Sequence, residues 1–284
     1  PQLCTDVPAA PSPQRTACHG ADAARVVSWT GHILPVVATI VVWFLATGLI
    51  AWADNRERRT FPRSLMLAGI AGVGGLAVVA WSMNKPTLTG VYAAFAGAIL
   101  IWSWHEISFL TGAITGPRRE ACPVEARGLE RFFHAVSAVA WHEIALALSA
   151  IGLISLSWNA ANQIGAMTFT LLLAMRLSTK LVIFFGVPNM STEIFPPHLA
   201  YLKTYFGPRR MGLELFLAIS GTSALAVWLG LIAINAPEGS ASASGASLLF
   251  ALAALGALEH LFLALPIRDG ALWGWALPSR RPAN

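Results

Sequence analysis

The sequence predicts an all-α integral membrane protein, a polytopic helical bundle with about seven transmembrane helices. Hydrophobic residues make up 56% of the 284 residues, and charged residues make up only 12%, about half the share usual in soluble proteins. The mean hydropathy is +0.61, and runs of about 20 apolar residues recur along the chain. This composition excludes a disordered chain and a nucleic-acid-binding protein, and it argues strongly against a soluble enzyme.

The apolar runs define the predicted elements in order. We expect spans at residues 31–52, 64–82, 91–115, 132–155, 164–187, 212–235 and 247–267. Residues 1–30 are predicted to be a loose N-terminal tail, residues 31–277 a seven-helix transmembrane domain, and residues 278–284 a C-terminal tail. The Ser/Ala/Gly-rich segment 236–246 is expected to be a loop. Within the longer loop 188–211, the amphipathic stretch 198–206 favours either a short interfacial helix or a plain hairpin connection.

Basic residues predict the orientation of the spans. They follow the first, third, fifth and seventh spans, whereas the alternate loops hold only Lys85 and the N-terminal tail holds Arg15 and Arg25. The positive-inside rule therefore predicts a periplasmic N-terminus and a cytoplasmic C-terminus. The basic residues of the predicted cytoplasmic segments are Arg56, Arg58, Arg59, Arg63, Arg118, Arg119, Arg127, Arg131, Lys203, Arg209, Arg210, Arg268, Arg280 and Arg281.

Four of the predicted spans place ionisable residues in one layer near the middle of the membrane, and each such charge costs a few kcal/mol there unless it is paired. His105 and His142 each lie ten residues from the predicted cytoplasmic end of their spans, about 15 Å deep at 1.5 Å per residue. Ionisable groups of this kind normally face the bundle interior. The candidate layer consists of His105, Glu106, His142, Glu143, Arg176, Lys180, Glu259 and His260.

Three interpretations of this layer compete. In the structural one, Glu106, Glu143 and Glu259 pair with the basic residues Arg176 and Lys180 and with the three histidines. In the second, the histidines and glutamates bind a divalent transition metal, because carboxylates and imidazoles are the ligands of di-metal bundle proteins, although the usual Glu-x-x-His spacing is absent. In the third, an imidazole is the axial ligand of a chlorin magnesium.

Several segments resemble the PuhE-type photosynthetic complex assembly proteins. They are HEISFLTGAITGPRREACP (105–123), NQIGAMTFTLLLAMRLSTKLVIFFGVPN (162–189), FPPHLAYLKTYF (195–206) and LEHLFLALPIRDGALWGWAL (258–277). The similarity runs from about residue 34 to residue 277, and residues 1–30 depart from the pattern. The resemblance implies a multi-pass protein of the bacterial inner, photosynthetic membrane, with reaction-centre and light-harvesting subunits and membrane lipids as partners and with a role in bacteriochlorophyll supply.

Three functions follow, of which a proton or small-solute path along His134 and the buried layer ranks lowest. The first is a non-enzymatic assembly factor for the reaction centre and its light-harvesting complex, in which His105, His142 and His260 are candidate magnesium ligands for bacteriochlorophyll. The alternative is a membrane metalloenzyme acting on a pigment, a quinone or another lipid-soluble substrate. In that case Glu106, Glu143 and Glu259 complete the metal site.

Overall fold

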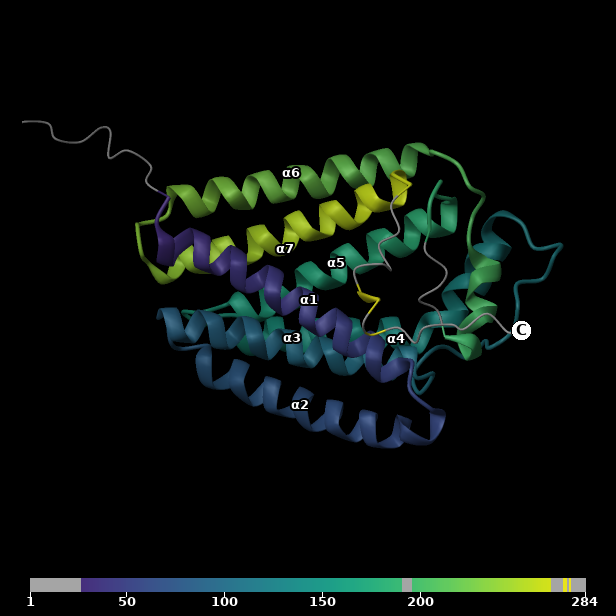
Figure 1. Ribbon diagram of the computed structural model, residues 1–284, viewed down its shortest axis with the longest axis horizontal. Coiled ribbons are helices and arrows are strands. Elements are labelled where there is room, and N and C mark those ends of the chain that lie inside the picture. Colours follow the sequence, from purple (N-terminus) through teal and green to yellow (C-terminus); the bar gives the residue numbers. More distant parts are fainter. Residues whose placement is uncertain (1–26, 191–195, 267–272, 275, 277–284) are drawn as a thin grey trace, which may run out of the picture.

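Seven long helices form the protein in a computed structural model that describes residues 27–190, 196–266, 273, 274 and 276. Each of the seven is long and apolar enough to cross a membrane. In Figure 1 they run along one common direction, so the predicted all-α membrane bundle is confirmed. They are α1 (Leu34–Asp54), α2 (Phe61–Ser82), α3 (Leu88–Leu110), α4 (Gly128–Ser157), α5 (Ile164–Phe185), α6 (Leu213–Asn235) and α7 (Ala241–Ala264).

Two predicted span ends are wrong. The helix α3 stops at Leu110, five residues before the predicted end, because Gly112 adopts a φ of +79° that no helix continues through. The helix α7 starts at Ala241, inside the predicted loop 236–246. The Ser240 side chain caps α7 by accepting a hydrogen bond of 3.0 Å from the Ala243 N–H. Small residues that look like a loop in the sequence therefore form the buried start of a helix.

The segments at the chain ends are only partly described. Of the predicted tail, residues 1–26 lie outside the described residues, as do residues 278–284. Trp29–Ile33 form a single π-helical turn that leads into α1. The predicted tail and domain boundaries therefore stay predictions over most of their length.

Part of the connection between α5 and α6 forms a short helix. The 3₁₀-helix η4 (Pro197–Tyr205) covers most of the predicted amphipathic stretch. Its Leu199, Leu202 and Tyr205 side chains are buried against Phe109 at the end of α3 and Ala138 in the first half of α4. This segment thus packs onto the bundle, and residues 191–195 before it lie outside the described residues.

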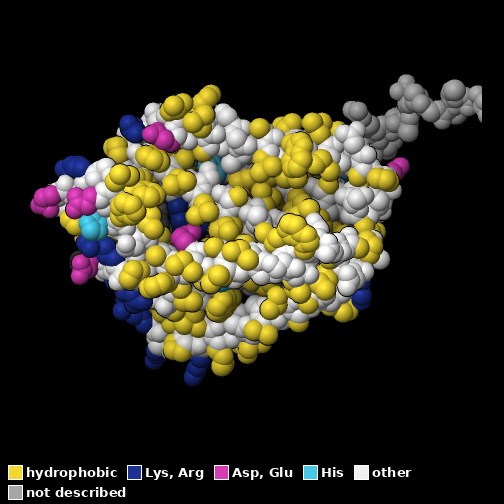
Figure 2. Space-filling model, turned by 180° about the vertical axis from the view of Figure 1, so that it is seen from behind, with side chains coloured by type: hydrophobic (Ala, Val, Ile, Leu, Met, Phe, Trp, Pro, Cys, Tyr) yellow, Lys and Arg dark blue, Asp and Glu magenta, His cyan; other side chains and the backbone are white. Residues whose placement is uncertain are grey.

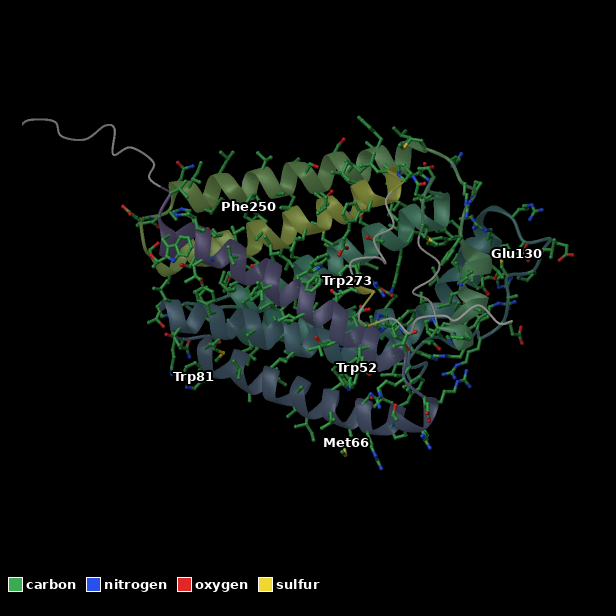
Figure 3. The ribbon with its side chains drawn as sticks, viewed as in Figure 1. Trp52, Met66, Trp81, Glu130, Phe250 and Trp273 are labelled. Carbon is green, nitrogen blue, oxygen red and sulfur yellow. The ribbon has the colours of Figure 1, made fainter. Side chains whose placement is uncertain are left out.

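The helices α3 and α7 lie at the centre of the bundle. About half of the membrane-spanning window of each is buried (50% and 56%), against 17% for α1. The helix α2 packs closely on α3 at Gly75 and Gly97, where a Cβ on either residue would meet the carbonyl oxygen of the other, at 2.5 and 2.7 Å. The other face of α2 is open, and Met66 projects from it away from the bundle (Figure 3).

Basic side chains gather at one end of the molecule, which we call the Arg-rich end (Figure 2). The segments at this end include the turn before α2, the α3–α4 loop and the segment before α6. Glu130 lies at this end and Trp81 lies near the opposite one (Figure 3). The distribution agrees with the predicted topology, whereas the side of the membrane that this end faces stays a prediction.

Candidate functional site

Two ion pairs connect α5 to α3 and α4. Arg176 and Lys180 are one helical turn apart on α5, so both project from the same face of this helix. Arg176 Nη2 lies 2.9 Å from Glu106 Oε2 of α3, and Lys180 Nζ binds Glu143 Oε1 of α4. Pairing offsets the cost of placing these charges at membrane depth. The two pairs therefore hold three helices in register, as the structural interpretation expected.

Next to the ion pairs, two histidines from α3 and α4 lie side by side. The ring centroids of His105 and His142 are 6.5 Å apart, and their side chains are 2% and 0% exposed. His105 Nε2 lies 2.9 Å from Ser149 Oγ. His105 Nδ1 and both ring nitrogens of His142 have no hydrogen-bond partner among the described residues. Buried polar atoms are usually paired, so these nitrogens, together with Glu106 Oε1, Glu143 Oε2 and Arg176 Nε, which also lack partners among the described residues, are not explained by the two ion pairs.

One aromatic ring, that of Phe109, lies close to His142 and to both cations. The Phe109 ring centroid is 4.6 Å from that of His142, 5.2 Å from Lys180 Nζ and 6.0 Å from Arg176 Cζ. Cations at these distances are attracted to an aromatic face. Phe109 thus covers one side of the imidazole and helps to hold the basic side chains of α5.

At His142, the backbone of α4 forms a hydrogen bond with the loop that follows α3. The His142 N–H donates a 2.9 Å hydrogen bond to the carbonyl oxygen of Thr115, in the loop that follows α3. Gly116 makes this approach possible, because a Cβ there would lie 2.0 Å from the Ser137 carbonyl oxygen. The loop at the Arg-rich end is therefore connected directly to the histidine layer.

The described hydrogen bonds of Glu259 and His260 on α7 go to residues outside the candidate layer. Glu259 Oε1 accepts a 3.2 Å hydrogen bond from Trp43 Nε1 of α1. His260 Nδ1 lies 2.7 Å from the Gly256 carbonyl oxygen, and its Nε2 lies 2.9 Å from Ser178 Oγ of α5. Both ring nitrogens of His260 are thus engaged, which leaves neither available to coordinate a magnesium ion.

The arrangement does not itself form a metal site. Among the residues that the structure describes, no three His, Cys, Asp or Glu side chains are placed to hold a metal ion. One carboxylate oxygen of Glu106 and one of Glu143 are already committed to cations. A metal site at the predicted ligands therefore needs a rearrangement of the layer and stays a prediction.

A bacteriochlorin does not fit at these histidines either. Axial coordination needs an imidazole nitrogen that faces a space as wide as the macrocycle. The side chains of His105, His142 and His260 are at most 2% exposed, and Phe109 covers one side of His142. The predicted magnesium ligands are thus closed to a pigment in this conformation.

A separate apolar groove of about 1200 Å³ lies over the first half of α5, between α4 and α6, at the end opposite the Arg-rich end. The start of α7 closes it on one side, and none of the eight predicted site residues lines it. Small side chains form one stripe of its floor at a spacing of four residues, namely Ala166, Thr170 and Ala174. The exposed indoles of Trp158 and Trp228 lie in its two walls.

Sequence analysis missed the groove and several polar contacts of the layer, among them those of Ser149, Thr115, Ser178 and Trp43. The spacing of small residues on α5 is the signal that would have indicated the groove. Ser149 lies seven residues after His142, two turns along the same face of α4, which would have placed it opposite α3. Nothing local to Thr115 predicts its contact with α4, because that contact joins a loop to a distant helix.

Comparisons with known proteins place the chain in a family. The family model described as "Protein of unknown function (DUF3623)" matches residues 30–284. An uncharacterized 30.4 kDa protein in the puhA 5′ region of Rhodobacter capsulatus is 37% identical over 251 residues, which cover 87% of this chain and 91% of that protein. No solved structure matches the chain.

Proposed function

This chain belongs to the DUF3623 family, and from that premise we propose that it is an integral membrane assembly factor for the photosynthetic reaction centre and its light-harvesting complex. The seven apolar helices make a multi-pass membrane protein. The R. capsulatus relative carries the name of the puhA 5′ region, a photosynthesis gene region, which supports a role in the same process. The finer role, assembly, rests on the geometry of the groove.

The apolar groove is the observation that carries this proposal. Its volume of about 1200 Å³ exceeds the range of about 300–1,000 Å³ that is usual for small-molecule pockets. The Thr170 and Ala174 side chains on its floor are exposed, although they lie on a membrane-spanning helix with helices on both sides. In a bilayer this surface contacts lipid or a hydrophobic client.

A transmembrane helix of a reaction-centre or light-harvesting subunit is the client that the lining favours. Small residues four apart let a second helix approach closely, and packing of this kind drives helix association in membranes. The described lining contains no histidine, so it offers no imidazole to a chlorin magnesium. The client is therefore held by shape and van der Waals contact, which permits its later release into the complex.

The ion-pair layer has a supporting role in this function. Arg176 lies two residues beyond Ala174, at the point where the groove ends and the pairing with Glu106 begins. The pairs to α3 and α4 therefore fix the position and rotation of α5 while leaving its first half open. A helix that is anchored at one end and uncovered at the other presents a rigid floor to its client.

Filling the groove tests this proposal. Ala174→Trp places an indole on the groove floor, and Val73→Trp is the matched control on the lipid-facing side of α2, where the side chain is 71% exposed. We expect A174W to accumulate normally in the membrane but to lower the amount of reaction-centre–light-harvesting complex, measured by near-infrared absorption. The V73W variant should support normal complex levels. Normal complex in A174W, or equal losses in both variants, would show that the groove takes no part in assembly.

A further inference from the structure

A small pocket lined in part by basic and hydroxyl-bearing side chains lies at the Arg-rich end, apart from the groove. Its volume is about 270 Å³. Arg58 comes from the turn before α2, Thr115 and Arg119 come from the α3–α4 loop, and His198 and Tyr201 come from η4. Three segments far apart in the sequence thus build one enclosure where the membrane-spanning helices end.

Two buried hydroxyl groups in this pocket lack partners. Thr115 lines the pocket and is 1% exposed, and the hydroxyl of Tyr201 is also buried. Neither Thr115 Oγ1 nor the Tyr201 hydroxyl has a hydrogen-bond partner among the described residues. A hydroxyl group removed from water without a partner destabilises the fold. Two such groups in one pocket are donors available to a ligand with acceptor oxygens.

The charge of the pocket is positive. Arg58 and Arg119 line it, and neither forms an ion pair within the described part of the chain. No aspartate or glutamate is among the described residues that line it. Burial lowers the pKa of His198, its hydrogen bond to the Leu110 carbonyl opposes this effect, and the Arg58 guanidinium lowers the pKa further. The same field that disfavours a protonated imidazole favours a bound anion.

The backbone fixes the shape of the pocket. His198 Nε2 lies 2.8 Å from the Leu110 carbonyl oxygen at the end of α3. Gly112 has a φ of +79°, and a Cβ there would lie 3.2 Å from His198 Cδ2. The turn after α3 and the imidazole of η4 are thus fitted closely to each other. The part of the wall formed by the turn after α3 and by η4 is therefore preformed, and the exposed side chains of Arg58 and Arg119 complete it.

We propose that this pocket binds a phosphate group. Two guanidinium groups and two hydroxyl groups can serve the several acceptor oxygens of a tetrahedral oxyanion, and arginine is the preferred partner of phosphate. Basic pockets at the ends of membrane helices bind anionic lipid head groups. The exposed Met66 and Leu67 of α2 lie one to two turns from its start beside the pocket, where they can contact acyl chains. A phospholipid head group and free phosphate share the required chemistry.

Binding of two probes to the full-length protein, purified in neutral detergent, tests the proposal. The first probe is phosphatidylglycerol, with bound lipid counted by native mass spectrometry, and the second is inorganic phosphate, with binding read from thermal stabilisation. Arg119→Gln removes a guanidinium and Thr115→Val removes a buried hydroxyl at nearly constant volume. Arg209→Gln is the matched control, because Arg209 is exposed in the segment before α6 and does not line the pocket.

We expect Arg119→Gln to weaken binding about tenfold, the loss typical of one charge-assisted hydrogen bond. Thr115→Val should weaken binding several-fold, and Arg209→Gln should leave it unchanged. Displacement of the lipid by inorganic phosphate shows that the phosphate is the recognised group. Binding of phosphatidylglycerol alone identifies a lipid site, and binding of inorganic phosphate alone identifies a site for soluble phosphate. Absence of binding for both probes, or the same loss in R209Q as in R119Q, would overturn the proposal.

Discussion

Substituting Gly116 is expected to damage the loop that connects the Arg-rich end to the histidine layer. In Gly116→Ala the new Cβ would lie 2.0 Å from the Ser137 carbonyl oxygen and 2.6 Å from the Ala138 carbonyl carbon. Both are backbone atoms of α4, so no side chain can rotate to make room. The loop must retreat by more than about 1 Å to reach ordinary contact. That movement breaks the 2.9 Å hydrogen bond from the His142 N–H to the Thr115 carbonyl oxygen.

The size of the effect follows from these contacts. Overpacking of this kind costs about 1–3 kcal/mol, and the lost hydrogen bond adds about 1 kcal/mol. Gly74→Ala is the matched control, because nothing lies within 4 Å of the Cβ position at Gly74. Alanine in a helix interior is favoured over glycine by up to about 1 kcal/mol. The control should therefore keep or raise the stability of the protein.

The free energy of unfolding of both variants is measured by reversible unfolding in mixed micelles, followed by tryptophan fluorescence. We expect Gly116→Ala to lower the free energy of unfolding by about 2–4 kcal/mol and to weaken phosphate binding, because Thr115 moves with the loop. Gly74→Ala should change neither property for the worse. Wild-type stability in Gly116→Ala, or the same loss in both variants, would refute the steric reasoning.

Three further predictions concern the buried layer and the phosphate pocket. Glu106→Gln leaves Arg176 without its carboxylate and should lower the free energy of unfolding by about 3 kcal/mol. The Glu106→Gln/Arg176→Gln double variant should recover part of this loss. Unchanged stability of Glu106→Gln would show that the pair is not stabilising. His142→Gln should leave membrane abundance unchanged on immunoblots while lowering the level of photosynthetic complex, and normal complex levels would leave the imidazole without a functional role. Histidine-selective NMR should give His198 a pKa below its ordinary 6.5. The unfolded chain then binds more protons than the folded one, so the contribution of His198 to stability is lost as the pH falls below 6.5. A pKa above 6.5 in phosphate-free buffer would contradict the assigned environment.

Hydropathy alone was enough to predict the number and order of the spans. Each apolar run is long enough to cross a bilayer, and the cost of exposing backbone groups to lipid forces such runs into helices. The two wrong ends depended on properties that hydropathy does not report. At the end of α3 the chain direction is set by the left-handed conformation of Gly112, and at the start of α7 a run of small residues is helical because it is capped and buried.

The candidate layer was predictable in part. Charges within apolar spans indicate that partners exist, and Arg176 and Lys180 lie on the helix face that meets two of the three glutamates. The third, Glu259, accepts a hydrogen bond from an indole instead, since its position depends on the rotation of α7. The groove and the phosphate pocket arise from contacts between distant segments, and no local pattern encodes such contacts completely.

Photo-crosslinking from within the groove tests the proposed function most directly. A photoreactive amino acid in place of Thr170 would sit on the groove floor, and one in place of Met66 would sit on the open face of α2. In cells that are forming the photosynthetic complex, we expect the probe at residue 170 to link to a transmembrane segment that mass spectrometry identifies as a reaction-centre or light-harvesting subunit. The probe at residue 66 should give no such product. Crosslinks to these subunits from both positions alike, or to lipid alone from residue 170, would contradict a client site in the groove.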